Sequence, residues 1–186
     1  MEERIEDNES YERRDCLVFS GAKIPPHAND ENCISIIQEL ARNNLKISIP
    51  ENEISVAHNV GTRNPTQSGN KRSIIAKFCR RNTKMDVLSS ARKMKIENLF
   101  VNESLTPQQR TIGYVLRRAR RDRPDRISGS TTVDGKHYVW IKPVNSSAPA
   151  SKNNKLLIGT IEKLRRFTLE YLEKPLSAYI DENKLI

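Results

Sequence analysis

Short apolar runs and one amphipathic repeat alternate along the first half of the chain. Four apolar runs have the length and composition of β-strands and lie at residues 15–21, 54–60, 73–79 and 98–102. Between the first two runs we predict a helix, capped by Asn29 or Asp30, because apolar residues recur at the i, i+3, i+4 and i+7 positions of one face. These positions are Cys33, Ile36, Ile37 and Leu40.

A second helix is predicted between the last two apolar runs. Thr83 caps its N-terminus, and Asp86, three residues later, completes the pattern of a capping box. Together with the four strands, the two helices give the order β-α-β-β-α-β, which is the split βαβ pattern of an α+β domain. We expect this domain to span residues 15–103.

A smaller α+β module is predicted over residues 104–143. Thr106, Pro107 and Gln109 indicate a helix start, because Thr is a good cap, Pro suits the first turn and Gln reaches back to the cap. This helix extends to Asp122. Two strand patterns then flank a dipeptide that is favoured in the two-residue turns of β-hairpins, Asp134-Gly135. The strand patterns lie at residues 127–133 and 136–142.

Composition marks the remaining segments. Residues 144–155 are rich in Ser, Ala and Asn and are interpreted as a linker. An apolar helix face then predicts a last helix of unknown role over residues 156–174. Residues 1–14 are predicted to be the remnant of an N-terminal helix or coiled coil.

The positive charge of the chain is concentrated in one stretch. The sequence has 32 Lys and Arg residues and 23 Asp and Glu residues, a formal net charge of +9. Residues 71–126 contain 16 of the basic residues and only 5 of the acidic ones, so this segment carries +11 and the rest of the chain −2. A solubilising surface spreads its charge, whereas a concentrated excess favours a polyanionic partner.

The helix over residues 107–122 separates into two faces when its residues are placed at about 100° per step. The apolar face consists of Ile112, Val115, Leu116 and Ala119. The opposite face consists of Arg110, Tyr114, Arg117 and Arg121, flanked by Arg118 and Arg120. Such arginines repel each other, and a bound polyanion would relieve the repulsion. The alternative is a solvated face, but the absence of an acidic residue before Asp122 favours nucleic acid.

The hairpin offers a second surface. Strand alternation places on one of its faces Lys136, Tyr138, Trp140 and Lys142. Aromatic rings between lysines suit stacking on unpaired bases, which is worth about 1–3 kcal/mol per base. In the alternative interpretation, the two rings belong to the core. On the other face of the hairpin, His137 is expected to be structural.

The third strand extends the basic surface into the first domain. Its outward positions are Lys71, Ser73, Ile75 and Lys77. This composition favours phosphate contact over base stacking. The basic edge continues with Arg80, Arg81 and Lys84. The second helix closes with Arg92, Lys93 and Lys95. Cations at a helix C-terminus also complement the helix dipole, so a structural role suits these last three equally well.

We expect no enzymatic activity, no cofactor and no bound metal. The sequence contains no GxSxG, HExxH, P-loop or carboxylate cluster. A hidden nuclease or phosphoesterase site is the enzymatic alternative. The three cysteines, which are far apart, are interpreted as buried thiols in a reducing compartment: Cys16, Cys33 and Cys79. No apolar stretch approaches the roughly 18 residues of a membrane span, so the chain is expected to be soluble and intracellular.

Four segments of the chain occur in a distinctive order: YERRDCLVFSG, IIAKFCRR, LFVNESLTPQQR and DGKHYVWIKP. In order and spacing they resemble the RNA-binding protein encoded by the first open reading frame of LINE-one-type retrotransposons (the LINE-type transposase domain family). The resemblance covers about residues 9–143. It implies an RNA-recognition-motif (RRM) domain and a small C-terminal domain, both of which bind single-stranded RNA or DNA. It also implies a retrotransposon ribonucleoprotein with nucleic-acid chaperone activity, which we expect in the cytoplasm, with the nucleus as a second location. The family's N-terminal coiled coil forms homotrimers, so we expect a homotrimer on the condition that such a coiled coil precedes residues 1–14.

Carried over position by position, the resemblance implies specific contacts. The family's basic contacts fall on Arg72, Lys77, Arg80, Arg81, Arg92, Lys93 and Arg110. Tyr138 matches the aromatic residue of the family's terminal strand. A standard RRM has stacking aromatics on its first and third strands, but the corresponding residues here are Val18, Ser73 and Ile75. The segment after Ser146 has no counterpart in the resemblance.

These observations predict a binder of single-stranded nucleic acid without sequence specificity. A basic cleft between the two domains is expected to follow the phosphates, with the arginine-rich helix closing over the strand. The alternative is a co-opted protein-interaction module, in which the basic helix docks an acidic partner.

Overall fold

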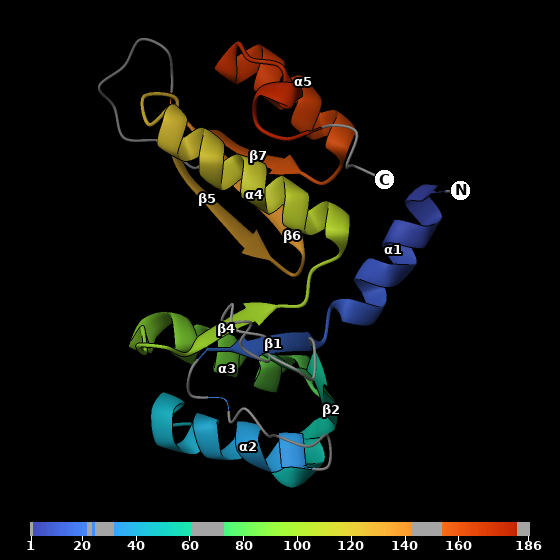
Figure 1. Cartoon of the computed structure of the whole chain (residues 1–186), viewed down its shortest axis with the longest axis vertical. Helices are drawn as coiled ribbons and strands as arrows, with labels where there is room; N and C mark the ends of the chain where they lie inside the picture. Colours follow the sequence, from blue (N-terminus) through green and yellow to red (C-terminus); the bar gives the residue numbers. More distant parts are fainter. Residues whose placement is uncertain (1, 22–23, 25–31, 61–72, 143–153, 182–186) are drawn as a thin grey trace, which may run out of the picture. The chain divides into compact units, whose positions relative to one another are not determined.

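The computed structural model of the chain describes residues 2–21, 24, 32–60, 73–142 and 154–181 (Figure 1). In these residues the fold is mixed α+β, as predicted, with five α-helices and two antiparallel sheets. The chain divides into two compact units. The first unit is Tyr11–Ser104, and the second combines Met1–Ser10 with Leu105–Ile186. None of the helices in the described residues is both long and apolar enough to cross a membrane.

The first unit contains a four-stranded antiparallel sheet in the order β2-β3-β1-β4. The four strands and two helices that the sequence predicts for this part of the chain are present. Their bounds are β1 (Cys16–Ser20), α2 (Cys33–Leu40), β2 (Ile54–Val60), β3 (Ser73–Phe78), α3 (Arg81–Met94) and β4 (Phe100–Glu103). A π-helical turn at Ala41–Leu45 continues α2, and a 3-10 turn at Glu51–Glu53 precedes β2.

One face of this sheet packs against the helices. Its fully buried residues on β1 and β3 are Leu17, Phe19, Ile74 and Ala76. They share a core with Ile37 of α2 and Val87 of α3. Because side chains alternate along a strand, Val18, Ile75 and Lys77 point to the opposite face, where they are half-buried or exposed, as predicted. We call this surface the open face of the first unit.

The N-terminus of α3 differs from the prediction. The helix begins at Arg81, and its N-cap Arg80 has an extended backbone and makes no side-chain cap hydrogen bond. Thr83 lies inside the first turn, where its hydroxyl donates to Oε2 of Glu53 at 2.9 Å. The predicted capping box at Thr83 is therefore wrong, because a residue far away in the sequence binds the hydroxyl.

The second unit contains a three-stranded antiparallel sheet in the order β5-β6-β7. The predicted helix and hairpin are confirmed as α4 (Pro107–Asp122), β5 (Ile127–Val133) and β6 (Lys136–Ile141). The predicted capping box is also confirmed: Thr106 Oγ1 accepts from the Gln109 N–H at 3.1 Å, and Gln109 Oε1 accepts from the Thr106 N–H at 3.0 Å. Asp134 and Gly135 have φ angles of 53° and 71°, as a type I′ hairpin turn requires.

The residues after the hairpin fold differently from the prediction. β7 (Lys155–Ile158) pairs with β6, where the sequence predicts the end of a linker and the start of a helix. α5 (Ile161–Leu172) follows, capped by Thr160, whose hydroxyl accepts from the Lys163 N–H at 3.2 Å. A single helix over residues 156–174 is therefore wrong, because so short an apolar run suits a strand as well as a helix. Residues 144–153 of the predicted linker lie outside the described residues.

Both α4 and α5 cover the same face of the second sheet (Figure 1). Val139 of β6 and Ile158 of β7 share one core with Leu116 of α4 and Leu164 of α5. The last helix, for which the sequence suggests no role, thus completes the core of the second unit.

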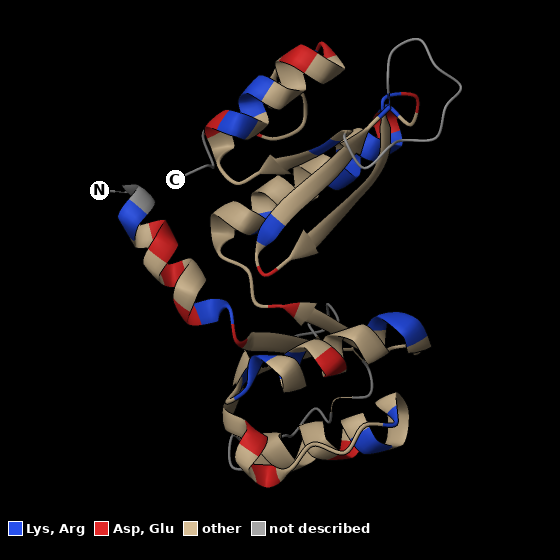
Figure 2. Ribbon diagram, turned by 180° about the vertical axis from the view of Figure 1, so that it is seen from behind, with Lys and Arg blue, Asp and Glu red and all other residues tan. Residues whose placement is uncertain are grey.

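The predicted N-terminal helix is confirmed as α1 (Glu2–Arg13), which carries charges of both signs (Figure 2). Within the second unit, Glu6 accepts a hydrogen bond from the Thr106 hydroxyl, and Ser10 Oγ accepts from Gln109 Nε2 at 2.8 Å. Both residues of the α4 capping box are therefore bonded to α1 as well.

Candidate nucleic-acid interface

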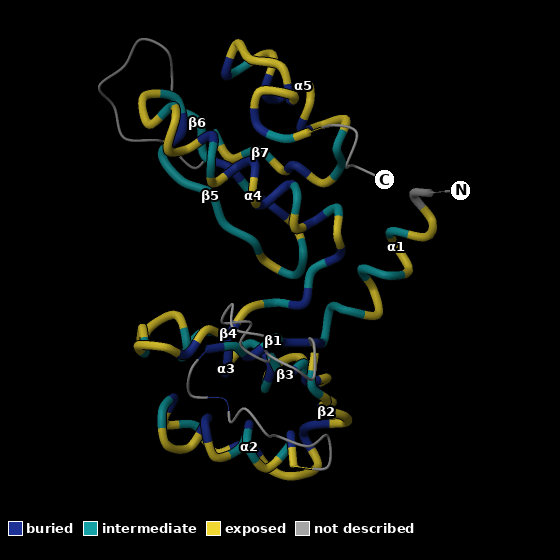
Figure 3. Tube along the Cα trace, in the orientation of Figure 1, coloured by how far each residue is buried: buried dark blue, intermediate teal, exposed yellow. Residues whose placement is uncertain are grey.

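The outward face of α4 carries the side chains that the sequence predicts for it. Positions along the helix alternate between buried and exposed (Figure 3). The apolar residues Ile112, Val115, Leu116 and Ala119 are buried. The exposed residues on the other side, which we call the arginine face, are Arg110, Tyr114, Arg117, Arg120 and Arg121. Tyr114 is 45% exposed, so its ring is accessible among the guanidinium groups.

The guanidinium groups of the arginine face are not neutralised by the protein. In the part of the chain that the structure describes, none of the four makes a hydrogen bond or an ion pair with another side chain. The helix has no acidic residue before Asp122, its last position. Like charges at this spacing repel each other along a helix, and an anion on this face would lower the repulsion. The arrangement is typical of a surface that contacts phosphate.

Arg118, which the sequence includes in the predicted interface, contacts the protein itself. Its Nη1 donates to the backbone carbonyl of Tyr179 at 2.9 Å, and the residue is half-buried. This bond joins α4 to the segment that follows α5. We therefore treat Arg118 as a structural residue and not as part of the arginine face.

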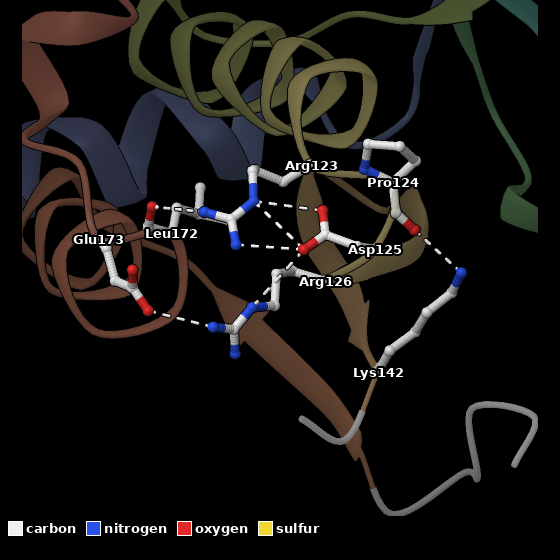
Figure 4. A network of polar contacts seen from close by, with 7 residues as sticks. All are labelled: Arg123, Pro124, Asp125, Arg126, Lys142, Leu172 and Glu173. Atoms are coloured by element: carbon white, nitrogen blue, oxygen red, sulfur yellow. Dashed lines mark hydrogen bonds and ion pairs between the residues drawn. The ribbon is translucent and has the colours of Figure 1, made fainter. Parts of the chain in front are cut away.

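Two further arginines lie just after α4 and hold its end to α5 (Figure 4). Arg123 Nη1 donates to the backbone carbonyl of Leu172 at 3.1 Å, and its Nη2 lies 3.1 Å from Oδ2 of Asp125. The hydrogen bond between these two side chains lowers the pKa of Asp125 and raises that of Arg123. Arg126 Nη2 lies 3.1 Å from Oε1 of Glu173. These ion pairs neutralise the charges of Arg123 and Arg126, whereas the guanidinium groups of the arginine face have no acidic partner in the described residues.

The side of the second sheet opposite α4 bears the aromatic residues of the hairpin. Tyr138 and Trp140 are half-buried there, whereas Val139 between them is fully buried in the core. The two rings are thus outside the core, so the interpretation that they belong to the core is wrong, and stacking on bases stays a prediction. Lys155 of β7 places its Nζ 3.9 Å from the ring centroid of Tyr138 and 5.7 Å from that of Trp140. We call the surface formed by Lys136, Tyr138, Trp140 and Lys155 the aromatic face.

The arginine face and the aromatic face lie on opposite sides of the second unit. Since α4 packs on the core side of the sheet, its exposed residues point away from the sheet, and the two rings point in the other direction. A nucleic-acid strand bound to the arginine face can reach the two rings only by passing around an edge of the β-sheet. The expected cleft between the two domains stays a prediction.

His137 is structural, as the sequence predicts. It is 2% exposed, and its Nδ1 lies 2.8 Å from Oγ1 of Thr132. Burial, together with the nearby positive charge of Arg117, lowers the pKa of His137 to about 4. The imidazole is therefore neutral near pH 7 and adds no charge to either face.

On the first unit, the predicted basic edge consists of two separate groups. Lys77, Arg80 and Arg81 are exposed where β3 leads into α3, and Arg80 Nη1 lies 3.2 Å from Oε1 of Glu53. The second group of predicted basic contacts, Arg92 and Lys93, lies in the last turn of α3. The 14 residues of this helix span about 20 Å at 1.5 Å per residue. A single phosphate therefore cannot contact both groups. The predicted contact Arg72 lies outside the described residues.

Lys84 does not extend this basic edge, contrary to the prediction. It is 1% exposed, its Nζ lies 3.3 Å from Oε1 of Glu103, and it also donates to the backbone carbonyl of Arg14. The prediction is wrong because Lys84 occupies the buried side of α3, where its charge is paired inside the unit.

Two side chains on these surfaces are not among the predicted residues. Lys155 lies in the predicted linker, because β7 can be recognised only by its pairing with β6. Phe100 of β4 is 58% exposed, on the open face of the first unit. Strand alternation would have found it, since its neighbour Val101 is buried.

The cysteines differ in burial. Cys16 and Cys33 are buried, as predicted, but Cys79 is exposed just after β3, so the prediction of three buried thiols is wrong. Burial raises the pKa of the Cys16 thiol. Among the described residues, no group of three or more His, Cys, Asp or Glu residues could hold a metal ion.

Neither a protein-family model nor a curated protein matches this chain. The resemblance to the retrotransposon family therefore rests on the four segments quoted above.

Proposed function

We propose that this chain binds single-stranded RNA or DNA without sequence specificity, as part of a ribonucleoprotein of the LINE retrotransposon type. The arginine face carries the proposal, because its four guanidinium groups have no partner within the described residues and share one exposed side of a helix. Guanidinium groups match phosphate geometry with two parallel hydrogen bonds. Phosphates are common to all sequences, so such contacts hold a strand without reading it.

An RRM-like arrangement of the first unit supports the same proposal. The sheet order β2-β3-β1-β4 and the element order β-α-β-β-α-β suit the split βαβ pattern. Val18 and Ile75 are paired in the register at the centre of the open face, where RRM domains carry stacking aromatics. With these aliphatic residues in place, phosphate contacts by Lys77, Arg80 and Arg81 would dominate binding to this unit.

Salt dependence tests the proposal. A labelled oligo-dT is titrated with the wild-type chain and with the double variant Arg117→Ala/Arg121→Ala, with fluorescence anisotropy as the readout. The binding constant falls as salt rises, and each lost phosphate contact makes the slope of log K against log salt shallower by about 0.7 for a single strand. For the double variant we therefore expect a slope shallower by about 1.4. The matched control is Lys163→Ala/Arg166→Ala, which removes two exposed charges from α5. Equal slopes for the two double variants, or no binding at low salt, would contradict the proposal.

A second candidate function is the binding of an acidic protein partner. Three exposed apolar residues on strands of the first unit favour a protein contact: Val56, Val60 and Phe100. The arginine face would then pair with carboxylates instead of phosphates. A polyglutamate peptide of the same charge as the oligonucleotide discriminates the two functions. If it binds as tightly as the oligonucleotide at the same salt concentration, the protein-binding function is favoured.

A further inference from the structure

The two rings of the aromatic face have small neighbours on β5. In the register of the sheet, Gly129 lies opposite Trp140, and Thr131 lies opposite Tyr138. A Cβ on Gly129 would be 3.5 Å from Cε3 of Trp140, so the indole lies beside a residue that has no side chain. On the β5 side, the rings therefore have no bulky neighbour that would block a planar ligand.

Lys155 approaches both rings from the β7 side. It lies opposite Trp140 in the register, and its ammonium group is 3.9 Å from the Tyr138 centroid and 5.7 Å from the Trp140 centroid. A cation at an exposed ring face is held only weakly. An aromatic ligand with larger contact area can therefore replace it over Tyr138.

The charge of the aromatic face restricts the class of ligand. The strands β5, β6 and β7 contain no Asp or Glu, whereas Lys136 and Lys155 are exposed on this face. Ring faces next to ammonium groups suit a ligand that is both planar and anionic. A nucleotide has both features, and its base face is free only when the base is unpaired.

We propose that Tyr138, Trp140 and Lys155 form a base-stacking site for an unpaired nucleotide, separate from the phosphate contacts of the arginine face. In the free protein, the Lys155 ammonium covers the rings. When a base stacks, the ammonium moves aside and pairs with the adjoining phosphate. The inference rests on the proposed binding of single strands, and it assigns Lys155 as a further binding residue on the opposite side of the second unit.

The fluorescence of Trp140 tests this site directly, because the chain has one tryptophan. The full chain is titrated at low salt with labelled oligo-dT and with an abasic strand that has the same number of phosphates. We expect both strands to raise the anisotropy of the label, because the arginine face binds phosphate. Only oligo-dT is expected to quench Trp140, because only that strand has bases to stack.

Variants of Lys155 test its role. Lys155→Ala is expected to weaken oligo-dT binding about threefold and to lower the salt slope by about 0.7, the value for one phosphate contact. The quenching of Trp140 should persist, because the rings remain. Lys155→Arg should keep the wild-type slope. The matched control Lys163→Ala removes an exposed charge from α5, on the other side of the sheet, and should leave the slope and the quenching unchanged.

Tyr138→Ala separates stacking from charge. It is expected to weaken oligo-dT binding about fivefold or more, the lower limit for loss of one stacked base, without changing the affinity for the abasic strand. Equal quenching by the two strands, or binding of both without quenching, would overturn the stacking site and leave binding by the arginine face intact. Equal salt slopes for Lys155→Ala and Lys163→Ala would remove Lys155 from the site. If neither strand binds at low salt, the proposed function fails and the inference fails with it.

Discussion

Gly113 of α4 lies against the imidazole of His137 on β6, and a Cβ on Gly113 would be 2.9 Å from Cε1 of His137. Glycine inside a helix costs about 1 kcal/mol relative to alanine. At this buried position, the missing side chain instead allows α4 to pack closely on the sheet. The contact therefore fixes the height of α4 above β6 and, with it, the position of the arginine face.

We expect Gly113→Ala to destabilise the second unit by about 1 kcal/mol. The new methyl group must displace His137, and overpacking of this kind costs about 1–3 kcal/mol. The gain in helix propensity, about 1 kcal/mol, offsets part of this cost. Urea unfolding followed by far-UV circular dichroism measures the difference.

A double-mutant cycle isolates the contact as the cause. In a His137→Ala background the imidazole is absent, so Gly113→Ala should become neutral or stabilising. The same destabilisation in both backgrounds would show that another neighbour, and not His137, limits the space at position 113.

His137 also makes the unfolding free energy depend on pH. Burial lowers its pKa in the folded chain to about 4, from an ordinary value of 6.5. The unfolded chain therefore takes up a proton below about pH 6.5, whereas the folded chain does so only near pH 4. Because the unfolded state binds more protons in this window, the free energy of unfolding falls as the pH drops from 6.5 to 4. The full effect is on the order of 3 kcal/mol. Urea unfolding at several pH values in this window measures it.

The variant His137→Gln provides the control for this pH dependence. It should flatten the unfolding free energy between pH 6.5 and 4, whatever its effect on stability at pH 7. Asp125 acts in a different window, because its lowered pKa places its stabilising effect above the ordinary value of 3.8 and its loss below it. An unchanged slope in the variant would assign the pH dependence to other groups.

Thr106 and Thr160 are matched helix caps with different surroundings. Each hydroxyl accepts from the backbone N–H three residues later, but the Thr106 hydroxyl also donates to Glu6 of α1. Replacing a Thr cap by Ala costs about 1 kcal/mol. We expect that cost for Thr160→Ala and about 2 kcal/mol for Thr106→Ala, because the second variant also leaves Glu6 without this donor. Equal losses in urea unfolding would mean that the bond to α1 adds no stability.

The sequence predicted those parts of the fold that local patterns determine. Thr106, Pro107 and Gln109 specify the start of α4 without any distant partner, and its 3.6-residue periodicity separates buried from exposed positions. Asp134 and Gly135 likewise determine the hairpin turn by their own backbone preferences. For this reason the exposed positions of α4 agree with the prediction except at Arg118, and the alternation of β6 agrees with it throughout.

The features that the sequence did not predict depend on distant partners. Lys155 is part of a strand because β6 lies beside it, and Lys84 is buried because Glu103 pairs with its charge. The arginines of α4 all carry the same guanidinium group. Only the structure shows that Arg118 donates to the backbone carbonyl of Tyr179, 61 positions away. No local pattern distinguishes such a residue from an exposed neighbour.

Arg117 and Arg118 are adjacent in sequence but should respond to substitution in opposite ways. Arg118→Ala removes the hydrogen bond to the Tyr179 carbonyl, which we expect to cost about 1–2 kcal/mol of unfolding free energy, because the donor is charged and half-buried. It should leave oligonucleotide affinity at moderate salt nearly unchanged.

Arg117→Ala removes an exposed guanidinium without a partner in the described residues, so the unfolding free energy should change by less than about 0.5 kcal/mol. The salt slope of oligonucleotide binding should become shallower by about 0.7. Urea unfolding and anisotropy titrations on both variants measure the four quantities. If Arg118→Ala lowers the salt slope as much as Arg117→Ala does, both guanidinium groups contact the strand, and the division of α4 into structural and binding arginines must be abandoned.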